Sequence, residues 1–182
     1  MNVKLLFKAI LSIFITIIIF ACASQPINID YIPEKDIKSA LSTIKPMSLV
    51  IQVEEQYEDK FEGIMASIHK EDLNKSITTV FFEALKNEFE NNGHKVLLAG
   101  EGTANARVEM AINKFFSYNR DFIIKGTITI KNLYKPSENL TKVIAAREMG
   151  NSEIRKEAIK EFVWNFSNNA QIIKFLQSCQ PE

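Results

Sequence analysis

The sequence predicts an α+β fold, an α/β two-layer arrangement in which a mixed, largely antiparallel sheet of about four to five strands has two long helices on one face. Three observations lead to this prediction. A β-branched segment, an amphipathic helix and a short apolar segment follow one another between residues 49 and 98. Three longer segments with alternating apolar and polar residues occupy positions 106–149, and a second amphipathic helix comes after them.

The first unit begins with Leu49–Val53, whose β-branched composition favours a strand. The charged and mixed residues after it are expected to form a loop with a short strand near Ile64–Ile68. Asp72 is then expected to cap a helix with one apolar face, made of Leu73, Ile77, Val80, Phe81, Ala84 and Leu85. Gly93 ends this helix, and Lys95–Leu98 follows as a strand. The β-helix-β order predicts that the two strands are parallel.

The middle of the sequence predicts a meander of three strands, over residues 106–118, 122–134 and 140–149. Asn119–Asp121 favours a tight hairpin between the first two, and Lys135–Asn139 favours the second turn. Apolar residues alternate with polar ones along these segments, so one face of the sheet is expected to be covered and the other to meet solvent.

The closing helix is expected to start near Asn151, with a buried face made of Ile154, Ala158, Ile159, Phe162 and Phe166. Ser167–Asn169 has low helix propensity and predicts a break. A short terminal helix, Ala170–Ser178, then follows and is expected to bury Ile173 and Leu176.

The N-terminus has the features of a bacterial lipoprotein signal. Lys4 and Lys8 provide positive charge, Ala9–Ala21 is almost entirely apolar, and a small residue precedes Cys22. This motif implies cleavage before Cys22 and a lipid on its sulfur atom. A lipid of several acyl chains would be an effectively permanent membrane anchor.

Two other interpretations of this segment stay open. Ala21–Ala23 also has the small-x-small form that ordinary signal peptidases cut, which would release a soluble protein without Cys22. The second interpretation is a retained transmembrane helix over Leu5–Ala21. This stretch is short for a bilayer core of about 30 Å and contains Lys8.

The predicted domain organisation has three parts: a signal peptide over residues 1–21, a lipidated tether over 22–46, and a single α/β domain over 47–182. The tether carries three prolines and no long apolar period. Within it, the alternation over Ile27–Tyr31 allows a short edge strand, and residues 36–43 allow one or two helical turns.

Composition excludes several classes of function. The formal net charge is zero, so nothing indicates nucleic-acid binding. The two histidines, His69 and His94, lie in different segments and are expected at the surface, which leaves no metal site and no cofactor indicated. With Cys22 lipidated, Cys179 is the single thiol, expected in the tail without consequence or in a bond between chains. No catalytic motif is found, so a non-enzymatic protein is expected.

Three aromatic residues are candidates for partner binding: Trp164, Phe115 and Phe82. Trp164 lies opposite the apolar face of its helix, and Phe82 lies at the flank of its own. By parity with Val108, the ring of Phe115 is expected to point away from the core. Aromatic side chains outside a core often anchor interfaces. The alternatives are that the tether or a loop covers these rings, or that they contact lipid head groups.

The layout resembles the YajG family of bacterial lipoproteins. The resemblance rests on Cys22, strand Leu49–Val53, a helix that ends at Asn92–Val96, an alternating strand pair around Val108–Ile112 and Ile124–Ile130, and a closing helix followed by Ile172–Leu176. It implies an α/β domain on an outer-membrane anchor, with an uncharacterised activity and no known catalytic residues. The layout is also similar, more broadly, to auxiliary lipoproteins of transport machines.

The sequence therefore predicts a lipid-anchored envelope lipoprotein that faces the periplasm. Ala23 stands where an aspartate would favour the inner membrane, so the outer membrane is expected. The leading hypothesis is a non-enzymatic accessory that binds an envelope protein in assembly or transport, and homo-oligomerisation stays open. The alternative is a carrier or sensor of a lipid or other small hydrophobic ligand, which requires an apolar cavity between sheet and helices.

Overall fold

The computed structural model describes residues 31–33, 37–57, 60, 63–66, 73–98, 101–118, 121–150 and 153–180. The predictions for Cys22, the signal peptide, the first nine residues of the tether, His69 and Asn119–Arg120 lie outside these residues. The elements in chain order are η1 (Ala40–Thr43), β1 (Ser48–Glu55), α3 (Ile77–Asn91), β2 (Lys95–Leu97), β3 (Ala106–Tyr118), β4 (Asp121–Asn132), β5 (Asn139–Met149), α4 (Ile154–Ser167) and α5 (Ala170–Ser178).

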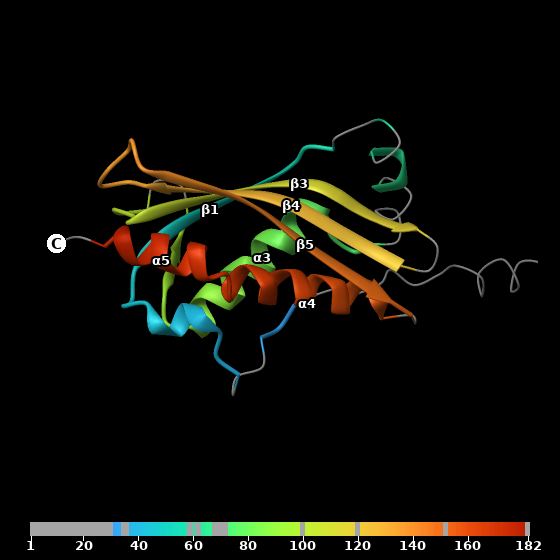
Figure 1. Cartoon of the computed structure of the whole chain (residues 1–182), viewed down its shortest axis with the longest axis horizontal. Helices are drawn as coiled ribbons and strands as arrows, with labels where there is room; N and C mark the ends of the chain where they lie inside the picture. The colour runs from blue at the N-terminus through green and yellow to red at the C-terminus, as the bar shows by residue number, and fades with distance from the viewer. Residues whose placement is uncertain are drawn as a thin grey trace, which may run out of the picture.

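The described residues form one mixed five-stranded sheet in the order β2-β1-β3-β4-β5. Strand β1 is parallel to both β2 and β3, which confirms the predicted parallel pair. Strands β3, β4 and β5 form an antiparallel meander. Figure 1 shows α3, α4 and α5 together on one side of the sheet. The predicted α+β class is confirmed.

Helix α3 begins later than predicted. Its N-cap is Ser76, whose Oγ accepts a hydrogen bond from the backbone N–H of Thr79 at 3.2 Å. The prediction that Asp72 caps this helix is therefore wrong, because Ser76 is the N-cap and accepts the N–H of Thr79. The helix ends as predicted, with Gly93 at a φ of +90°. Residues 63–66 are helical, so the strand expected near Ile64 is also wrong.

The C-terminal helices follow the prediction closely. Helix α5 has the predicted bounds, and both Ile173 and Leu176 are buried. Asn169 causes the break before it, because its side-chain Oδ1 accepts hydrogen bonds from the backbone N–H groups of Gln171 at 3.1 Å and Ile172 at 3.2 Å. Asn169 is therefore the N-cap of α5, and α4 ends before it at Ser167.

The space between the sheet and the helices is filled by phenylalanine rings in edge-to-face contact. The ring centroid of Phe81 lies 5.3 Å from that of Phe162, and the centroids of Phe115 and Phe122 are 4.9 Å apart. Gly126 lies where the packing is tightest, since a Cβ atom there would come within 3.0 Å of the Phe162 ring. The interior of the domain is close-packed.

A β-bulge overturns the prediction for Phe115. The pairing of β3 with β4 shifts between Ile112 and Lys114, which leaves Asn113 as an extra residue. The side chain of Asn113 donates a hydrogen bond to the backbone oxygen of Gln56 at 3.0 Å. After the bulge the alternation of faces is reversed, so Phe115 points into the core with 0% of its surface exposed. It is not a surface aromatic residue.

The last residues of the predicted tether are part of the packed domain. Leu41 and Ile44 belong to the hydrophobic core, and the backbone N–H of Ala40 donates to Asn168 Oδ1 at 3.0 Å. The Nε2–H of His94 donates to the backbone oxygen of Leu41 at 3.0 Å. His94 is 5% exposed, so its expected surface position is wrong; burial under this segment lowers its pKa.

Cys179 is also buried rather than exposed in a tail. It follows α5 with 0% of its surface exposed, and burial raises the pKa of its thiol to about 11. A buried, protonated thiol does not react with a second chain while the domain is folded.

Candidate interaction groove

A groove lies between α4 and the residues 31–33 and 37, which we call the N-terminal segment. Its volume is about 340 Å³, which is within the range of small-ligand pockets. The residues that line it come from the N-terminal segment, α3, the end of β5 and α4: Tyr31, Ile32, Pro33, Ile37, Glu88, Glu148, Glu157, Lys160, Glu161 and Trp164. We call it the α4 groove.

Helix α4 supplies one wall of the α4 groove through a single stripe of side chains. Glu157, Lys160, Glu161 and Trp164 occupy positions i, i+3, i+4 and i+7, so they lie on the same side of the helix. The opposite side of α4, which includes Phe162, is fully buried against the core. The amphipathic pattern that docks the helix on the sheet therefore also directs this stripe outward.

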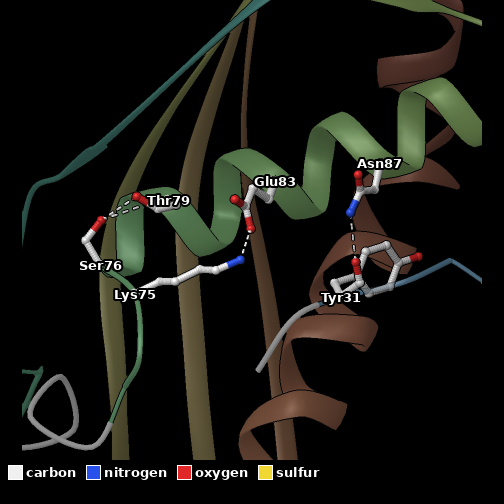
Figure 2. Close-up of polar contacts among 6 residues, drawn as sticks. All are labelled: Tyr31, Lys75, Ser76, Thr79, Glu83 and Asn87. Atoms are coloured by element: carbon white, nitrogen blue, oxygen red, sulfur yellow. Dashed lines mark hydrogen bonds and ion pairs between the residues drawn. The ribbon is translucent and has the colours of Figure 1, made fainter. Parts of the chain in front are cut away.

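The N-terminal segment is held on α3 by two hydrogen bonds of Tyr31. Its hydroxyl donates to Glu88 Oε2 at 2.8 Å. Its backbone oxygen accepts from Asn87 Nδ2 at 3.0 Å (Figure 2). Asn92 Nδ2 donates to the other carboxylate oxygen of Glu88 at 3.0 Å. Glu88 is 4% exposed, and these two donors compensate for its burial. The second wall of the α4 groove is thereby fixed.

The carboxylates of the α4 groove influence one another. Partial burial raises the pKa of Glu148, and the neighbouring charges of Glu161 and Glu157 add to this effect. Glu161 Oε2 in turn accepts from the backbone N–H of Arg147 at 3.1 Å. The end of β5 and α4 thus hold two acidic side chains next to each other at the groove.

Only one of the three aromatic candidates lies in the α4 groove. Trp164 is 45% exposed there, so its expected exposure is confirmed. Phe82 is half-buried and packs against the core, and Phe115 is fully buried. The structure brings no two of them together at the surface.

Sequence reasoning did not identify the acidic residues or isoleucines that accompany Trp164. For Glu88 a signal existed, since this charged residue falls on the apolar stripe of α3 with Ala84 and Leu85. For Ile32 and Glu148 no local signal existed, because they meet α4 only through the tertiary fold.

Within the described part of the chain, no group of three or more histidine, cysteine, aspartate or glutamate side chains is arranged to hold a metal ion. The helices described there are also too short or too polar to cross a bilayer. The α4 groove can make apolar contacts, and its glutamate side chains can accept hydrogen bonds or pair with a cation.

No family model and no curated protein matches the sequence. The fold is similar to solved structures. One is protein XCC0632 from Xanthomonas campestris, of the family DUF330, with a TM-score of 0.57, 10% identity, and coverage of 84% of this chain and 97% of that one. Another is the hypothetical protein CT253 from Chlamydia trachomatis, with a TM-score of 0.51, 8% identity, and coverage of 74% and 97%.

Lipoprotein GNA1162 from Neisseria meningitidis is a weaker match, with a TM-score of 0.36, 12% identity, and coverage of 69% of this chain and 99% of that one. A score of this size does not establish a common fold. The two stronger likenesses show that the chain shares its fold with bacterial proteins of very different sequence.

Proposed function

We propose that this protein is a non-enzymatic, lipid-anchored lipoprotein of the bacterial envelope, which faces the periplasm from the outer membrane and binds a protein partner. The lipoprotein signal that ends at Cys22 supports the anchor and the compartment. The fold shared with bacterial proteins such as XCC0632 agrees with a bacterial origin. The YajG-like family assignment remains part of this proposal.

The observation that carries partner binding is the exposed apolar surface at the α4 groove. Trp164 is 45% exposed, Ile37 48% and Ile32 79%. Large apolar side chains gathered beside a groove are typical of interaction sites, whereas single ones are ordinary on protein surfaces. Tryptophan is also enriched among the residues that contribute most to binding.

The alternative, a carrier of a hydrophobic ligand held between sheet and helices, receives less support. Such a ligand needs an apolar cavity in that layer. The rings of Phe81, Phe115 and Phe162 interlock there, and a Cβ added at Gly126 would lie 3.0 Å from the Phe162 ring. A partner that binds from outside needs no such cavity.

The anchor is tested by replacing the lipidated cysteine. In cells grown with radiolabelled palmitate, the wild-type protein is expected to take up label and to sediment with outer membranes, and Cys22→Ala is expected to do neither. Unlabelled wild-type protein, or label retained by Cys22→Ala, would contradict the proposed lipidation.

Partner binding is tested by site-specific cross-linking in intact cells. A photo-reactive amino acid at position 164 is expected to yield a discrete adduct with an envelope protein. The matched control is position 141, because Thr141 is exposed on the uncovered face of the sheet. Adducts of equal yield at both positions, or none at 164, would argue against a binding surface at the α4 groove.

A further inference from the structure

The α4 groove combines an apolar wall with an excess of carboxylates. The N-terminal segment contributes Tyr31, Ile32, Pro33 and Ile37, and four glutamates, one lysine and Trp164 complete the lining. A volume of about 340 Å³ fits a few side chains rather than a folded element. The shape therefore suits an extended segment of a partner better than a broad flat interface.

The charge of the α4 groove selects the chemistry of that segment. Glu148 and Glu161 both line the groove, and Glu161 Oε2 accepts from the backbone N–H of Arg147, the residue before Glu148, so two carboxylates of like charge lie close together. Glu157 stands one turn before Glu161 on the same stripe of α4. A cation placed among these side chains would relieve the repulsion between them, and a guanidinium group matches paired carboxylates in geometry as well as in charge.

Trp164 favours the same kind of occupant. It comes one turn after Glu161, so a cation bound to the glutamate is within reach of the indole face. Cations stack favourably on tryptophan, and the apolar neighbours of a lysine or arginine would cover Ile32 and Ile37. An anionic membrane surface would instead be repelled by the carboxylates.

We infer that the α4 groove binds an extended segment of a partner protein in which lysine or arginine alternates with apolar residues. This inference rests on the proposed function and specifies the partner's chemistry. The basic side chains pair with Glu148, Glu157 and Glu161, and the apolar ones pack on Trp164 and the two isoleucines. Since the ion pairs are partly exposed, binding weakens as ionic strength rises.

The test uses the full lipidated chain in phosphatidylcholine nanodiscs and a short peptide of alternating arginine and leucine. Trp164 is the single tryptophan of the protein, so its fluorescence reports on this groove alone. The peptide is expected to shift the emission to shorter wavelength as it covers the indole. A peptide of alternating glutamate and leucine, and one of arginine and serine, are expected to bind at least about tenfold more weakly.

Charge variants provide the matched comparison. The double variant Glu148→Gln/Glu161→Gln is expected to bind the arginine–leucine peptide about tenfold more weakly than wild type. The control Glu54→Gln/Glu109→Gln removes the same charge from a depression on the opposite face of the sheet and is expected to bind like wild type. If the first variant folds poorly, Glu157→Lys on the exposed stripe serves in its place and is expected to weaken binding further.

Equal binding of the acidic peptide, or equal loss in both double variants, would overturn the inference. The cross-linking experiment separates this outcome from failure of the proposed function. An adduct at position 164 with a segment that lacks basic residues, or with a second copy of this chain, would leave partner binding in place and refute the basic segment. Absence of any adduct would refute both.

Discussion

Two aromatic residues of α4, Phe162 and Trp164, show how one helix serves two regions of the molecule. Phe162 is fully buried in the layer between sheet and helices, with its ring centroid 5.3 Å from that of Phe81. Trp164 follows two residues later and is 45% exposed in the α4 groove. Residues two positions apart in an α-helix are rotated by about 200° around its axis, so Phe162 and Trp164 point in nearly opposite directions.

This difference separates stability from recognition. The inner layer is close-packed, so removal of a ring there leaves a cavity. At the α4 groove Trp164 is only partly buried, so its removal leaves no cavity in the core. Substitutions in the two regions should therefore have different signatures, and the predictions below test that separation.

The largest effect is expected for Phe115→Ala, because its ring is fully buried and meets Phe122 at 4.9 Å between centroids. The variant should lose about 3 to 5 kcal/mol of unfolding free energy in urea titrations followed by circular dichroism. Trp164→Ala is the control and should lose less than about 1 kcal/mol. Equal losses would break the distinction between the two regions.

A smaller effect is expected where the N-terminal segment docks on α3. Tyr31→Phe removes the hydroxyl that donates to buried Glu88, at a cost of about 1 to 2 kcal/mol. Hydrogen exchange should also become faster over residues 37–44, since their attachment is weakened. Tyr134→Phe is the control, because that hydroxyl is exposed and makes one long contact of 3.4 Å with Asn105. Unchanged exchange in Tyr31→Phe would show that the groove wall does not depend on this bond.

The pH dependence of stability should reveal the burial of His94. Burial lowers its pKa in the folded state below the ordinary value of 6.5, so the unfolded chain takes up the proton first as pH falls. The contribution of His94 to stability is therefore complete above pH 6.5 and declines below it. His94→Gln keeps a donor for Leu41 and should flatten this part of the curve. Identical pH profiles for both proteins would place His94 at the surface after all.

The smallest effect, and one of opposite sign, is expected for Glu148→Gln. The folded state raises the pKa of Glu148, so its charge costs stability at neutral pH. The variant should gain at most a few tenths of a kcal/mol at pH 7, and the gain should shrink as pH falls through the raised pKa of Glu148 and vanish below 4.5. Thermal unfolding at both pH values measures this difference. A destabilised variant would indicate that Glu148 serves the fold rather than recognition.

Much of the fold could be predicted because its signals are local. The bounds of Ala170–Ser178 follow from a capping asparagine and a periodic apolar face. The turn at Gly93 and the parallel pairing of β1 with β2 follow from turn chemistry and from the handedness of crossovers. The exposure of Trp164 follows from its place opposite the buried stripe of its own helix.

The misplaced residues share a physical cause, which is that burial depends on distant segments. One unpaired residue, Asn113, reverses the faces of β3, and an alternation pattern gives no warning of it. His94 is buried because the segment around Leu41 packs over it, more than fifty residues away in the chain. Cys179 is buried beside Ser178, whose backbone oxygen accepts a hydrogen bond from Asn132 at the end of β4, far away in the chain.

By itself, the sequence determined the order and type of most elements, the α+β class and the outward direction of Trp164, because each depends on contacts within a few residues. Only the tertiary structure decided which carboxylates and isoleucines stand beside that tryptophan. The α4 groove joins residues 31–33 and 37 with Glu88, Glu148 and the exposed stripe of α4, and no local pattern links them. The N-terminal segment packs against α3 and so reaches α4, because the Tyr31 hydroxyl donates a hydrogen bond to the buried carboxylate of Glu88.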